Sequence, residues 1–516
     1  MATRRDELSA HTFARKRTLA AFLQPESRVS DEEAPRPVRA MMPSMVVGLV
    51  LVAGAVAWGA IAPSAPHGWS TVGEHIIVDS DSTTRYVVLK ERDKNGKKVP
   101  QLHPVLNFAS AKLVLDKGKG QVIEVSGKDI DESTVARGST IGIPYAPDRL
   151  PSTADAESPK EWAVCEKPGS HARGEPQQGM FVLGGQDKNK LKDKNRLGDG
   201  EAMFVEDSKT GDQYMVDGTG TKMLLHDRMR ENAKFLKERS LLTRLAIKNP
   251  GDPQKVSSQW LETLNTGDPL TFPYLGGAGA GSPASFSGAD QLPPEGREVG
   301  KVLRSRAGNT SYYYVVMKDK VQRTTPLVGK LAMGGAGLGQ QKPITVNELQ
   351  MANAGASENT ATGGKGWPRD IMNQVNRPAE GIGSTSRTVS CSVYTGKTSG
   401  GKPQLAAWAG PRYPANIVDG AASAYVSSGS GLLYQEVTGS GSRSGTQYLL
   451  TDSGLRYALP KGGGDSQQGS GSSEKSPTAR LGYEKAKVAP VPRSWSSLLP
   501  KGPTLDTRSA SQEQGL

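Results

Sequence analysis

The hydrophobic pattern of the chain begins with one long uncharged run near the N-terminus. From Met41 to Gly73 no residue is charged, and the segment from Pro43 to Pro63 reads PSMVVGLVLVAGAVAWGAIAP. This segment has about 20 almost wholly apolar residues, and at about 1.5 Å per residue a helix of that length spans the roughly 30 Å hydrocarbon core of a bilayer. The pattern predicts a single transmembrane helix over residues 41–63.

The flanking charges predict the orientation of this helix. Residues 1–40 contain eight Lys and Arg residues, whereas residues 64–84 contain none. The positive-inside rule therefore places the N-terminus in the cytoplasm and the remainder of the chain outside. A cleaved signal peptide is one alternative, because Ala60-Ile61-Ala62 resembles a cleavage site, although the segment before the apolar run is long for a signal peptide. A buried soluble helix is the other.

A second helix is predicted before the apolar run. Arg5 to Leu23 reads RDELSAHTFARKRTLAAFL, in which Leu8, Thr12 and Leu19 share one stripe beside a basic cluster. Two interpretations of this amphipathic segment stay open. It is either a helix that rests on anionic lipid or a docking helix for a cytoplasmic partner.

Beyond the apolar run, four short tyrosine-led strand patterns recur. They are Tyr86-Val-Val-Leu, Tyr214-Met-Val-Asp, Tyr314-Val-Val-Met and Tyr448-Leu-Leu-Thr. The first and second patterns are separated by nearly the same length of chain as the third and fourth. This self-similarity predicts two homologous halves, each with two unlike repeats.

Two tryptophan boxes follow the second and fourth patterns. Trp260, Leu264, Gly267 and Leu270 stand at offsets 0, 4, 7 and 10, and the same residue types at the same offsets make the second box. The members of the second box are Trp495, Leu499, Gly502 and Leu505. The boxes support the division into two related halves.

The two cysteines follow the same spacing. The length of chain from Tyr86 to Cys165 nearly equals the length from Tyr314 to Cys391. A pseudo-two-fold pairing of the halves would bring the two cysteines together in a central sheet. Outside the cytoplasm a disulfide would persist, and two cysteines allow one connectivity. The alternative is two buried free thiols.

Composition adds few functional constraints. Apolar residues make up 35% of the 516 residues, and there are 61 glycines and 34 prolines, which favours several modest units joined by turns. The net charge of +12 is dilute over this length, and the basic runs lack interleaved aromatic residues. A nucleic-acid partner is therefore not expected.

No catalytic or metal-binding motif stands out, and no cofactor is predicted. The six histidines lack metal-ligand spacing, and no G-x-S-x-G motif is present. The nearest phosphate-loop signal is Gly396-Lys397-Thr398, but a Walker A motif needs a glycine five positions before Gly396, where this chain has Cys391. These three residues are a weak candidate for cofactor binding.

The order of these features resembles the EccB family, the single-pass membrane component of type VII (ESX-type) secretion systems. The likeness rests on the Arg5–Phe13 start, the single anchor, Ile141-Gly-Ile-Pro144, Trp162-Ala-Val-Cys165, the four repeats and the closing segment from Ser494 to Pro503. The resemblance implies that Cys165 and Cys391 form a core disulfide. Some EccB proteins are described as ATPases, whereas this sequence has no conventional motif to carry that activity.

The resemblance also implies an α+β fold. In this fold the transmembrane helix leads to an elongated extracytoplasmic region with four small α+β repeat domains around a central, mostly β core of two pseudo-symmetric halves. The predicted segments are 1–40 (cytoplasmic, with the amphipathic helix), 41–63 (transmembrane), 64–118 (repeat 1), 119–185 (core, first half), 186–275 (repeat 2), 276–296 (linker), 297–340 (repeat 3), 341–427 (core, second half), 428–506 (repeat 4) and 507–516 (disordered tail).

The function implied by the resemblance is that of a structural subunit of the type VII secretion complex in the inner membrane. Such a subunit would be an extracytoplasmic scaffold for the export of WXG-type substrates. Its partners would be EccC, EccD, EccE, other copies of itself and the lipid bilayer, with the mycosin protease nearby. The alternatives are a cell-envelope-binding repeat module on a membrane anchor and an extracytoplasmic nucleotide hydrolase.

Overall fold

The structure is a computed structural model of the whole chain, and its elements fall into two compact units. One unit comprises Met1–Trp69 and Ile123–Ser133, and the other comprises Ser70–Val122 and Thr134–Leu516. The residues that the structure describes are 4–23, 44–52, 65–92, 96–169, 175–226, 233–273, 279–378, 386–397, 403–417, 423–438, 445–461 and 476–514.

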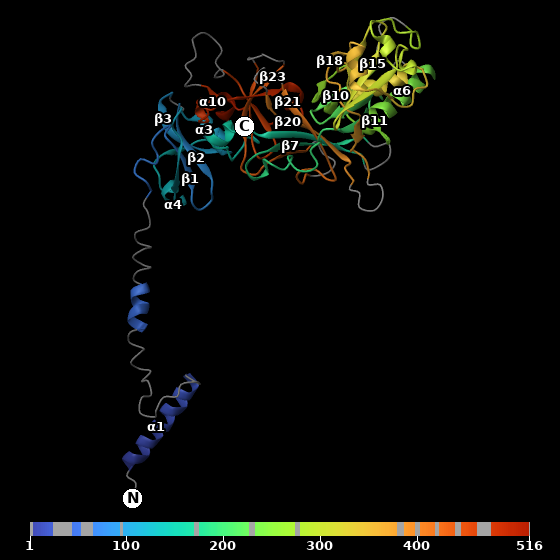
Figure 1. Ribbon diagram of the computed structural model, residues 1–516. Coiled ribbons are helices and arrows are strands. Elements are labelled where there is room, and N and C mark those ends of the chain that lie inside the picture. The colour runs from blue at the N-terminus through green and yellow to red at the C-terminus, as the bar shows by residue number, and fades with distance from the viewer. Residues whose placement is uncertain are drawn as a thin grey trace. The chain divides into compact units, whose positions relative to one another are not determined.

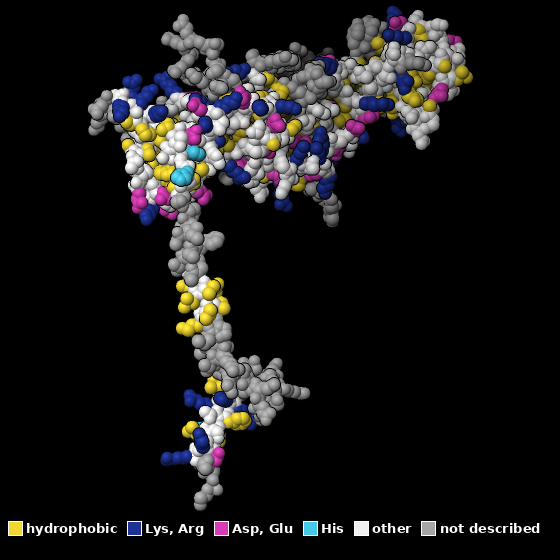
Figure 2. Space-filling view, turned by 90° about the vertical axis from the view of Figure 1, so that its left-hand side faces the viewer, with side chains coloured by type: hydrophobic (Ala, Val, Ile, Leu, Met, Phe, Trp, Pro, Cys, Tyr) yellow, Lys and Arg dark blue, Asp and Glu magenta, His cyan; other side chains and the backbone are white. Residues whose placement is uncertain are grey.

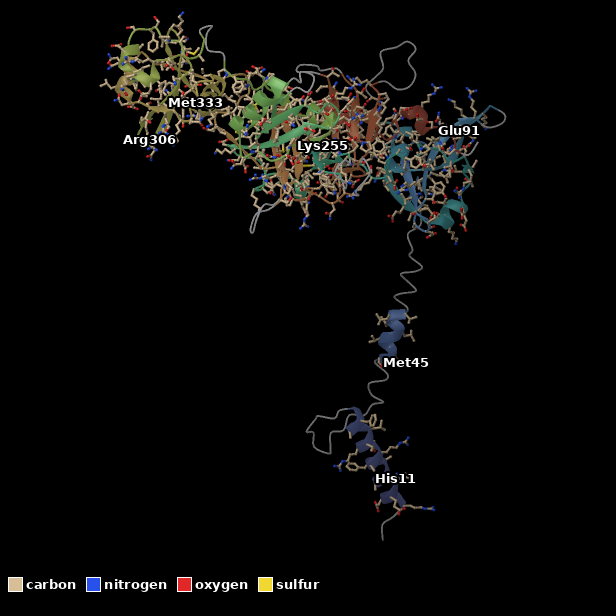
Figure 3. The ribbon with its side chains drawn as sticks, turned by 90° about the vertical axis from the view of Figure 1, so that its right-hand side faces the viewer. His11, Met45, Glu91, Lys255, Arg306 and Met333 are labelled. Carbon is tan, nitrogen blue, oxygen red and sulfur yellow. A yellow bond between two sulfur atoms is a disulfide. The ribbon has the colours of Figure 1, made fainter. Side chains whose placement is uncertain are left out.

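The first unit contains the two helices expected near the N-terminus, as far as the described residues cover them. Helix α1 spans Arg4–Leu23, and a second helix covers residues 44–52 within the apolar run. Apolar side chains cover the surface of this second helix, which carries Met45 (Figures 2 and 3). No helix of the described residues is both long and apolar enough to cross a membrane. Residues 41–43 and 53–63 of the predicted span lie outside the described residues.

A five-stranded sheet, here called the central sheet, forms the middle of the second unit (Figure 1). Its strands lie in the order β21-β20-β6-β7-β22, and all neighbours are antiparallel except β22, which runs parallel to β7. Both faces of the sheet are buried, which explains the apolar runs within β6 (Trp162–Cys165) and β21 (Leu405–Ala409), whereas β20 also buries Ser390 and Ser392. The bounds are β6 Glu161–Lys167, β7 Gln177–Leu183, β20 Val389–Lys397, β21 Pro403–Gly410 and β22 Ser423–Val426.

Four other sheets in this unit each contain an antiparallel three-stranded meander. Each of the four sequence patterns that begin with a tyrosine lies on the middle strand of one meander. The meanders are β1 His75–Asp79, β2 Arg85–Arg92 and β3 Lys98–Val105; β8 Glu201–Asp207, β9 Gln213–Asp217 and β10 Thr221–His226; β14 Val302–Ala307, β15 Thr310–Val316 and β16 Val321–Thr324; and β23 Leu432–Val437, β24 Gln447–Leu450 and β25 Arg456–Leu459.

Short strands extend the meanders, mostly in parallel. For example, β19 pairs with β8, so the chain returns from the third meander to the sheet of the second. The remaining strands are β4 Gln121–Val125, β5 Ala136–Arg137, β11 Ile247–Lys248, β12 Gln254–Val256, β13 Asn265–Thr266, β17 Ile344–Thr345, β18 Ser357–Ala361, β19 Met372–Gln374 and β26 Ala489–Pro492.

The helices are short, and most begin at a polar residue that caps the first turn. The side chains of Asn107, Ser257, Thr325 and Asp506, among others, accept a hydrogen bond from a backbone N–H of the helix that follows. The helices are α3 Phe108–Val114, α4 Gly127–Asp131, α5 Thr153–Glu157, α6 Ala233–Ala246, α7 Ser258–Glu262, α8 Pro326–Gly335, α9 Glu348–Asn353, α10 Pro477–Arg480, α11 Arg493–Ser496 and α12 Thr507–Ala510, with 3₁₀ turns η1 Gly185–Asp187, η3 Ala289–Gln291 and η4 Pro294–Gly296.

The structure contradicts the predicted disorder of the C-terminal tail and shows local order in part of the predicted linker. The expected linker over 276–296 is ordered from residue 279 onward, because Leu292 is buried and Phe286 packs against the same cluster on the third meander. The expected disordered tail over 507–516 instead forms α12, in which Ala510 is buried, and the Gln514 side chain donates to the carbonyl oxygen of Gly142 at 2.9 Å. Residues 515 and 516 lie outside the described residues.

The prediction of an α+β fold is confirmed, and the structure consists mostly of several small sheets. The central sheet gathers β6 and β7 from the first half of the chain and β20, β21 and β22 from the second half, so segments far apart in the sequence share one core.

Candidate functional site

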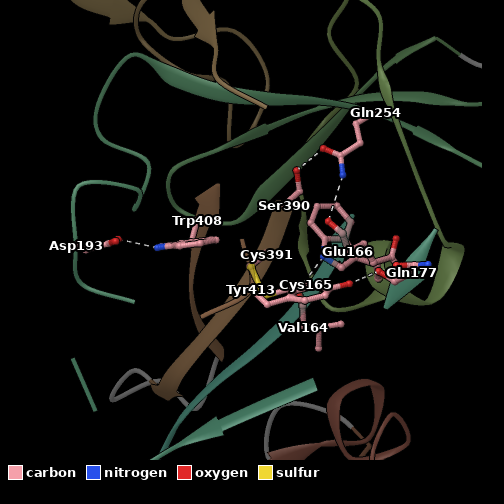
Figure 4. Close-up of a disulfide and its surroundings, with 11 residues drawn as sticks. Val164, Cys165, Glu166, Gln177, Asp193, Gln254, Ser390, Cys391, Trp408 and Tyr413 are labelled. Carbon is pink, nitrogen blue, oxygen red and sulfur yellow. Dashed lines mark hydrogen bonds between the residues drawn. A yellow bond between two sulfur atoms is a disulfide. The ribbon is translucent and has the colours of Figure 1, made fainter. Parts of the chain in front are cut away.

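The two cysteines form a disulfide at the centre of the central sheet (Figure 4). Cys165 on β6 lies directly opposite Cys391 on β20 in the antiparallel register, with their Cα atoms 4.0 Å apart. Both side chains are fully buried, among Phe181, Trp408 and other apolar residues. The bond therefore ties the two distant segments of the central sheet to each other, and the alternative of two free thiols is excluded.

A buried polar bridge crosses the same two strands one residue away from the disulfide. Gln254 on β12 donates to the carbonyl oxygen of Glu166 at 3.2 Å and accepts from the Ser390 hydroxyl at 2.7 Å. Glu166 and Ser390 are themselves opposite each other in the register of β6 and β20. The disulfide and the glutamine thus join the same pair of strands side by side (Figure 4).

The Glu166 carboxylate links the disulfide strand to the first tryptophan box. It accepts from the Ser257 hydroxyl at 2.5 Å, from the Ser257 backbone N–H at 2.8 Å and from Gln178 Nε2 at 2.9 Å. Burial raises the pKa of Glu166, while these hydrogen bonds act in the opposite direction. Because Ser257 is also the N-cap of α7, the carboxylate fixes the start of the helix that carries Trp260.

The two tryptophan boxes have matching backbone contacts. Gly267 N–H donates to the carbonyl oxygen of Lys222 and Leu270 N–H to that of Leu224, each at 2.9 Å. In the second box, the N–H groups of Gly502 and Leu505 donate to the carbonyl oxygens of Arg456 and Ala458, also at 2.9 Å. Each box therefore runs along the last strand of a meander, β10 in one case and β25 in the other.

Both glycines of the boxes stand where a side chain would collide. A Cβ atom at Gly267 would lie 2.9 Å from the carbonyl oxygen of Lys365, and one at Gly502 would lie 2.4 Å from the ring of Tyr457. Close approach of backbone to its neighbours explains why glycine occurs at this offset in each box.

Two aromatic side chains near the disulfide, those of Trp408 and Tyr413, form hydrogen bonds with polar groups. Trp408 lies opposite Cys391 on β21 and donates its indole N–H to Asp193 at 2.7 Å. The Tyr413 hydroxyl donates to the carbonyl oxygen of Gln177 at 2.7 Å (Figure 4). Tyr413 also packs against Phe181, with ring centroids 5.5 Å apart. These polar atoms around the disulfide are thus paired, as a rigid core requires.

The weak phosphate-loop candidate lies on a strand. Gly396 and Lys397 end β20 and pair with Gln404 and Pro403 of β21, so they belong to a β-hairpin. A phosphate loop instead leads from a strand into the N-terminus of a helix. The third residue of the candidate, Thr398, lies outside the described residues.

Sequence reasoning identified the cysteines and the boxes but missed the polar groups between them. Glu166, Gln254 and Ser390 come from three segments whose adjacency depends on the fold. One signal was available: Glu166 follows Trp162-Ala-Val-Cys165 directly, and a carboxylate at the end of a fully buried strand requires partners.

The sequence matches one protein family from end to end. The family described as "Type VII secretion system ESX-1, transport TM domain B" matches residues 1–516. Among curated proteins, the chain is 24% identical to "ESX-3 secretion system ATPase EccB3" of Mycobacterium tuberculosis (strain ATCC 25618 / H37Rv) over 98% of this chain and 88% of that protein. It is also 24% identical to the protein of the same name from Mycolicibacterium smegmatis (strain ATCC 700084 / mc(2)155), over 98% and 90% respectively.

Solved structures have the same fold. A chain of the "Structure of an intact ESX-5 inner membrane complex, Composite C3 model" superposes with a TM-score of 0.59 at 21% identity, covering 100% of this chain and 96% of that chain. A chain of the "Structure of EccB3 dimer from the ESX-3 core complex" gives a TM-score of 0.59 at 21% identity, over 85% of this chain and 99% of that chain. At this level of identity the likeness establishes the fold.

Proposed function

Since the chain belongs to the EccB family of type VII secretion membrane components, we propose that it is a structural subunit of an ESX-type secretion complex in the inner membrane. The family match over residues 1–516 is the observation that carries this proposal. The architecture agrees with it, because a disulfide locks the central sheet and Gln254 beside that bond hydrogen-bonds to both Glu166 and Ser390. Such a core is suited to holding surrounding domains in place.

Residues 41–63 are proposed as the single transmembrane helix, with the N-terminus in the cytoplasm. In support, the seven large apolar side chains of the described helix 44–52 are between 57% and 71% exposed in the isolated chain. A helix that is apolar on all sides needs lipid or protein around it. The family description also names a TM domain.

The extracytoplasmic part is proposed to consist of four repeat domains around the central sheet. The four three-stranded meanders, each with one tyrosine of the repeat pattern on its middle strand, support this count. The equal backbone contacts of the two tryptophan boxes support two related halves, with the second and fourth repeats as counterparts.

As partners we propose EccC, EccD, EccE and other copies of this chain, with the mycosin protease nearby and WXG-type proteins as exported substrates. The similar chains belong to structures described as an ESX-5 inner membrane complex and an EccB3 dimer, which supports both complex formation and self-association. Helix α1 is a candidate contact for cytoplasmic partners, because Leu8 and Phe22 on it are exposed.

Co-purification from the native membrane tests this function. Full-length chain with a C-terminal tag is extracted in a mild detergent and analysed by native electrophoresis and mass spectrometry. The expected result is a large assembly that contains a motor ATPase and further membrane subunits. A matched variant without residues 41–63 should remain outside this assembly. Recovery of the full-length chain only as a monomer, under conditions where other membrane complexes stay intact, contradicts the proposal.

A second candidate function is nucleotide hydrolysis, because the curated relatives are named ATPases. The Lys397→Ala variant tests the weak candidate for this chemistry. If purified full-length protein hydrolyses ATP and the variant does so at the same rate, residues 396–398 are not the site. A cell-envelope-binding role of the repeats is tested by sedimentation of the chain with purified cell wall.

A further inference from the structure

A cavity of about 290 Å³ opens beside the sheet of the third meander. Its wall is formed by β15, β16, the first residues of α8 and the segment from Thr360 to Arg369. Figure 3 shows this part of the second unit, with Arg306 on β14 and Met333 on α8 labelled. None of the motifs or contacts described above uses this cavity.

Two arginines give the cavity its charge. The guanidinium of Arg323, on β16, stacks over the ring of Tyr312, with its central carbon 4.1 Å from the ring centroid. Arg369 is positioned through its backbone, since its carbonyl oxygen accepts from the N–H of Leu327 at 3.1 Å. Neither guanidinium forms an ion pair with a carboxylate of the described residues, and none of the described lining residues is acidic.

The aromatic wall of the cavity is held in a fixed position. Trp367 donates its indole N–H to the carbonyl oxygen of Asp268 at 3.2 Å. Two glycines pack directly against the ring, because a Cβ atom at Gly363 would lie 2.2 Å from it and one at Gly364 would lie 2.5 Å from its nitrogen. Gly363 also has a φ of +80°, which a residue with a side chain rarely adopts. The loop from Gly363 is thus shaped around the indole.

Hydroxyl groups complete the lining, and the helix end adds partial positive charge. Ser311, Thr324, Thr325, Thr360 and Thr362 line the cavity, and the Thr324 hydroxyl donates to the carbonyl oxygen of Ala361 at 2.9 Å. The Thr325 hydroxyl oxygen already accepts from the N–H of Val328, and Leu327 N–H is also used. These N–H groups at the N-terminus of α8 already have hydrogen-bond partners. An anion in the cavity would therefore be bound by the arginine side chains rather than by backbone N–H groups.

We propose that this cavity binds a sugar ring that carries a carboxylate or phosphate group. Arginine side chains without carboxylate partners bind such anions by charge-assisted hydrogen bonds. The indole of Trp367 matches the apolar face of a sugar ring, and the hydroxyls match its polar edge, while the ring of Tyr312 supports the Arg323 guanidinium. The volume is at the lower end of the range for small-molecule sites, which suits a single ring with its anionic group.

The experiment measures direct binding to the full-length chain in detergent by saturation-transfer difference NMR of the ligand. The probes are glucuronic acid, glucose 6-phosphate and uncharged glucose. The expected result is saturation of at least one charged sugar and little saturation of glucose. Whichever charged sugar gives the larger signal identifies the carboxylate or the phosphate as the preferred group.

Variants connect the signal to the cavity. Arg369→Gln and Arg323→Gln should each weaken binding by about ten-fold or more, because each removes a charge-assisted contact. Arg508→Gln is the matched control, since it removes one arginine from α12, which does not line the cavity. Circular dichroism of each variant verifies that the fold is retained.

Three outcomes overturn the proposal. They are equal saturation of glucose and the charged sugars, no saturation of any probe, and unchanged binding in folded Arg369→Gln and Arg323→Gln variants. None of these outcomes depends on assembly with other secretion subunits, so failure here and failure of the proposed function are distinguishable.

Discussion

Trp260 donates its indole N–H to the backbone carbonyl oxygen of Val164 at 2.9 Å. Val164 is the neighbour of Cys165 on β6, so the first tryptophan box is attached to the strand that carries the disulfide. The tryptophan of the second box, Trp495, packs against Tyr394 on the partner strand β20, with ring centroids 5.7 Å apart. Both boxes therefore cover one face of the central sheet, while the disulfide lies on the other.

This relationship predicts the effect of replacing Trp260. Trp260→Phe removes the hydrogen bond, leaves the Val164 carbonyl oxygen buried without that donor and opens space in a fully buried cluster. We expect the free energy of unfolding to fall by about 2 kcal/mol. Chemical denaturation of the full-length chain in detergent, followed by far-ultraviolet circular dichroism, measures the change.

Trp69→Phe is the control for the tryptophan prediction, because Trp69 is only half-buried. It should change the free energy of unfolding by less than about 0.5 kcal/mol. Equal stability of Trp260→Phe and the unaltered chain would show that the contact to Val164 does not hold the box on the sheet.

The glycines of the two boxes give a second prediction. Gly502→Ala should destabilise the protein by about 1–3 kcal/mol, because the new methyl group would meet the buried ring of Tyr457 at 2.4 Å. Gly267→Ala should also destabilise it, since the group met there is the backbone oxygen of Lys365. Thermal unfolding of both variants tests whether the boxes are equivalent.

The matched glycine control is Gly198→Ala. At Gly198 the nearest atom to an added Cβ is a flexible carboxylate oxygen of Glu201 at 3.9 Å. Gly198→Ala should therefore leave the temperature of thermal unfolding nearly unchanged. If Gly267→Ala and Gly502→Ala unfold at the temperature of the control, the close approach of the boxes to their neighbours is not needed for stability.

The strands could be predicted from the sequence because their pattern is local. A tyrosine followed by apolar residues marks a half-buried strand, and all four such segments lie on middle strands of meanders. The cysteine pairing could be predicted from the matching spacing in the two halves. The tryptophan boxes could be predicted as a repeat, since their offsets are identical, although their contacts with β10 and β25 could not.

Other parts of the structure could not be predicted, because the composition of a segment does not show whether its few apolar side chains are buried. Residues 276–296 are rich in Gly, Ser and Pro, yet Leu292 is buried and Phe286 packs against the same cluster on the third meander. The last residues look polar, yet Ala510 is buried and Asp506 caps α12. The cavity lined by Arg323, Arg369 and Trp367 combines residues from segments that come together only in the folded sheet.

A pH-dependent prediction follows from Asp187. Its carboxylate accepts hydrogen bonds from Tyr425 and Ser427 on and beside β22, each at 2.8 Å, and it pairs with Lys190. The hydrogen bond with Lys190, followed by those from Ser427 and Tyr425, lowers the pKa of Asp187 below 3.8. The ionised carboxylate therefore stabilises the fold fully above about pH 4, and this contribution is lost as the pH falls through the lowered pKa.

Asp187→Asn should remove this part of the pH dependence. The variant should be less stable than the unaltered chain at neutral pH, and the difference in melting temperature should narrow as the pH falls below about 4. Melting curves between neutral and acidic pH measure the difference. Asp199→Asn, at an exposed position, is the control. If the difference in melting temperature between Asp187→Asn and the unaltered chain stays constant from neutral to acidic pH, the ionised Asp187 carboxylate is not the source of the pH dependence.

The disulfide gives the last prediction. Cys165 and Cys391 are 226 residues apart in the sequence, and closing so long a loop stabilises a folded protein by about 5 kcal/mol at most in the chain-entropy description. The bond lies between strands that already pair through their backbones, and Gln254 bridges the same strands. Reduction should therefore lower the free energy of unfolding by several kcal/mol while the central sheet stays formed under native conditions.

Variants of the two cysteines isolate the contribution of the bond. Cys165→Ala, Cys391→Ala and the double variant should lose nearly the same stability, because either single change already abolishes the bond. Peptide mapping without reductant should show the cross-linked pair in the unaltered chain. If the loss of unfolding free energy in the double variant equals the sum of the two single losses, the two side chains stabilise the core by independent packing. The comparison therefore separates the effect of the covalent bond from that of burying two small apolar side chains.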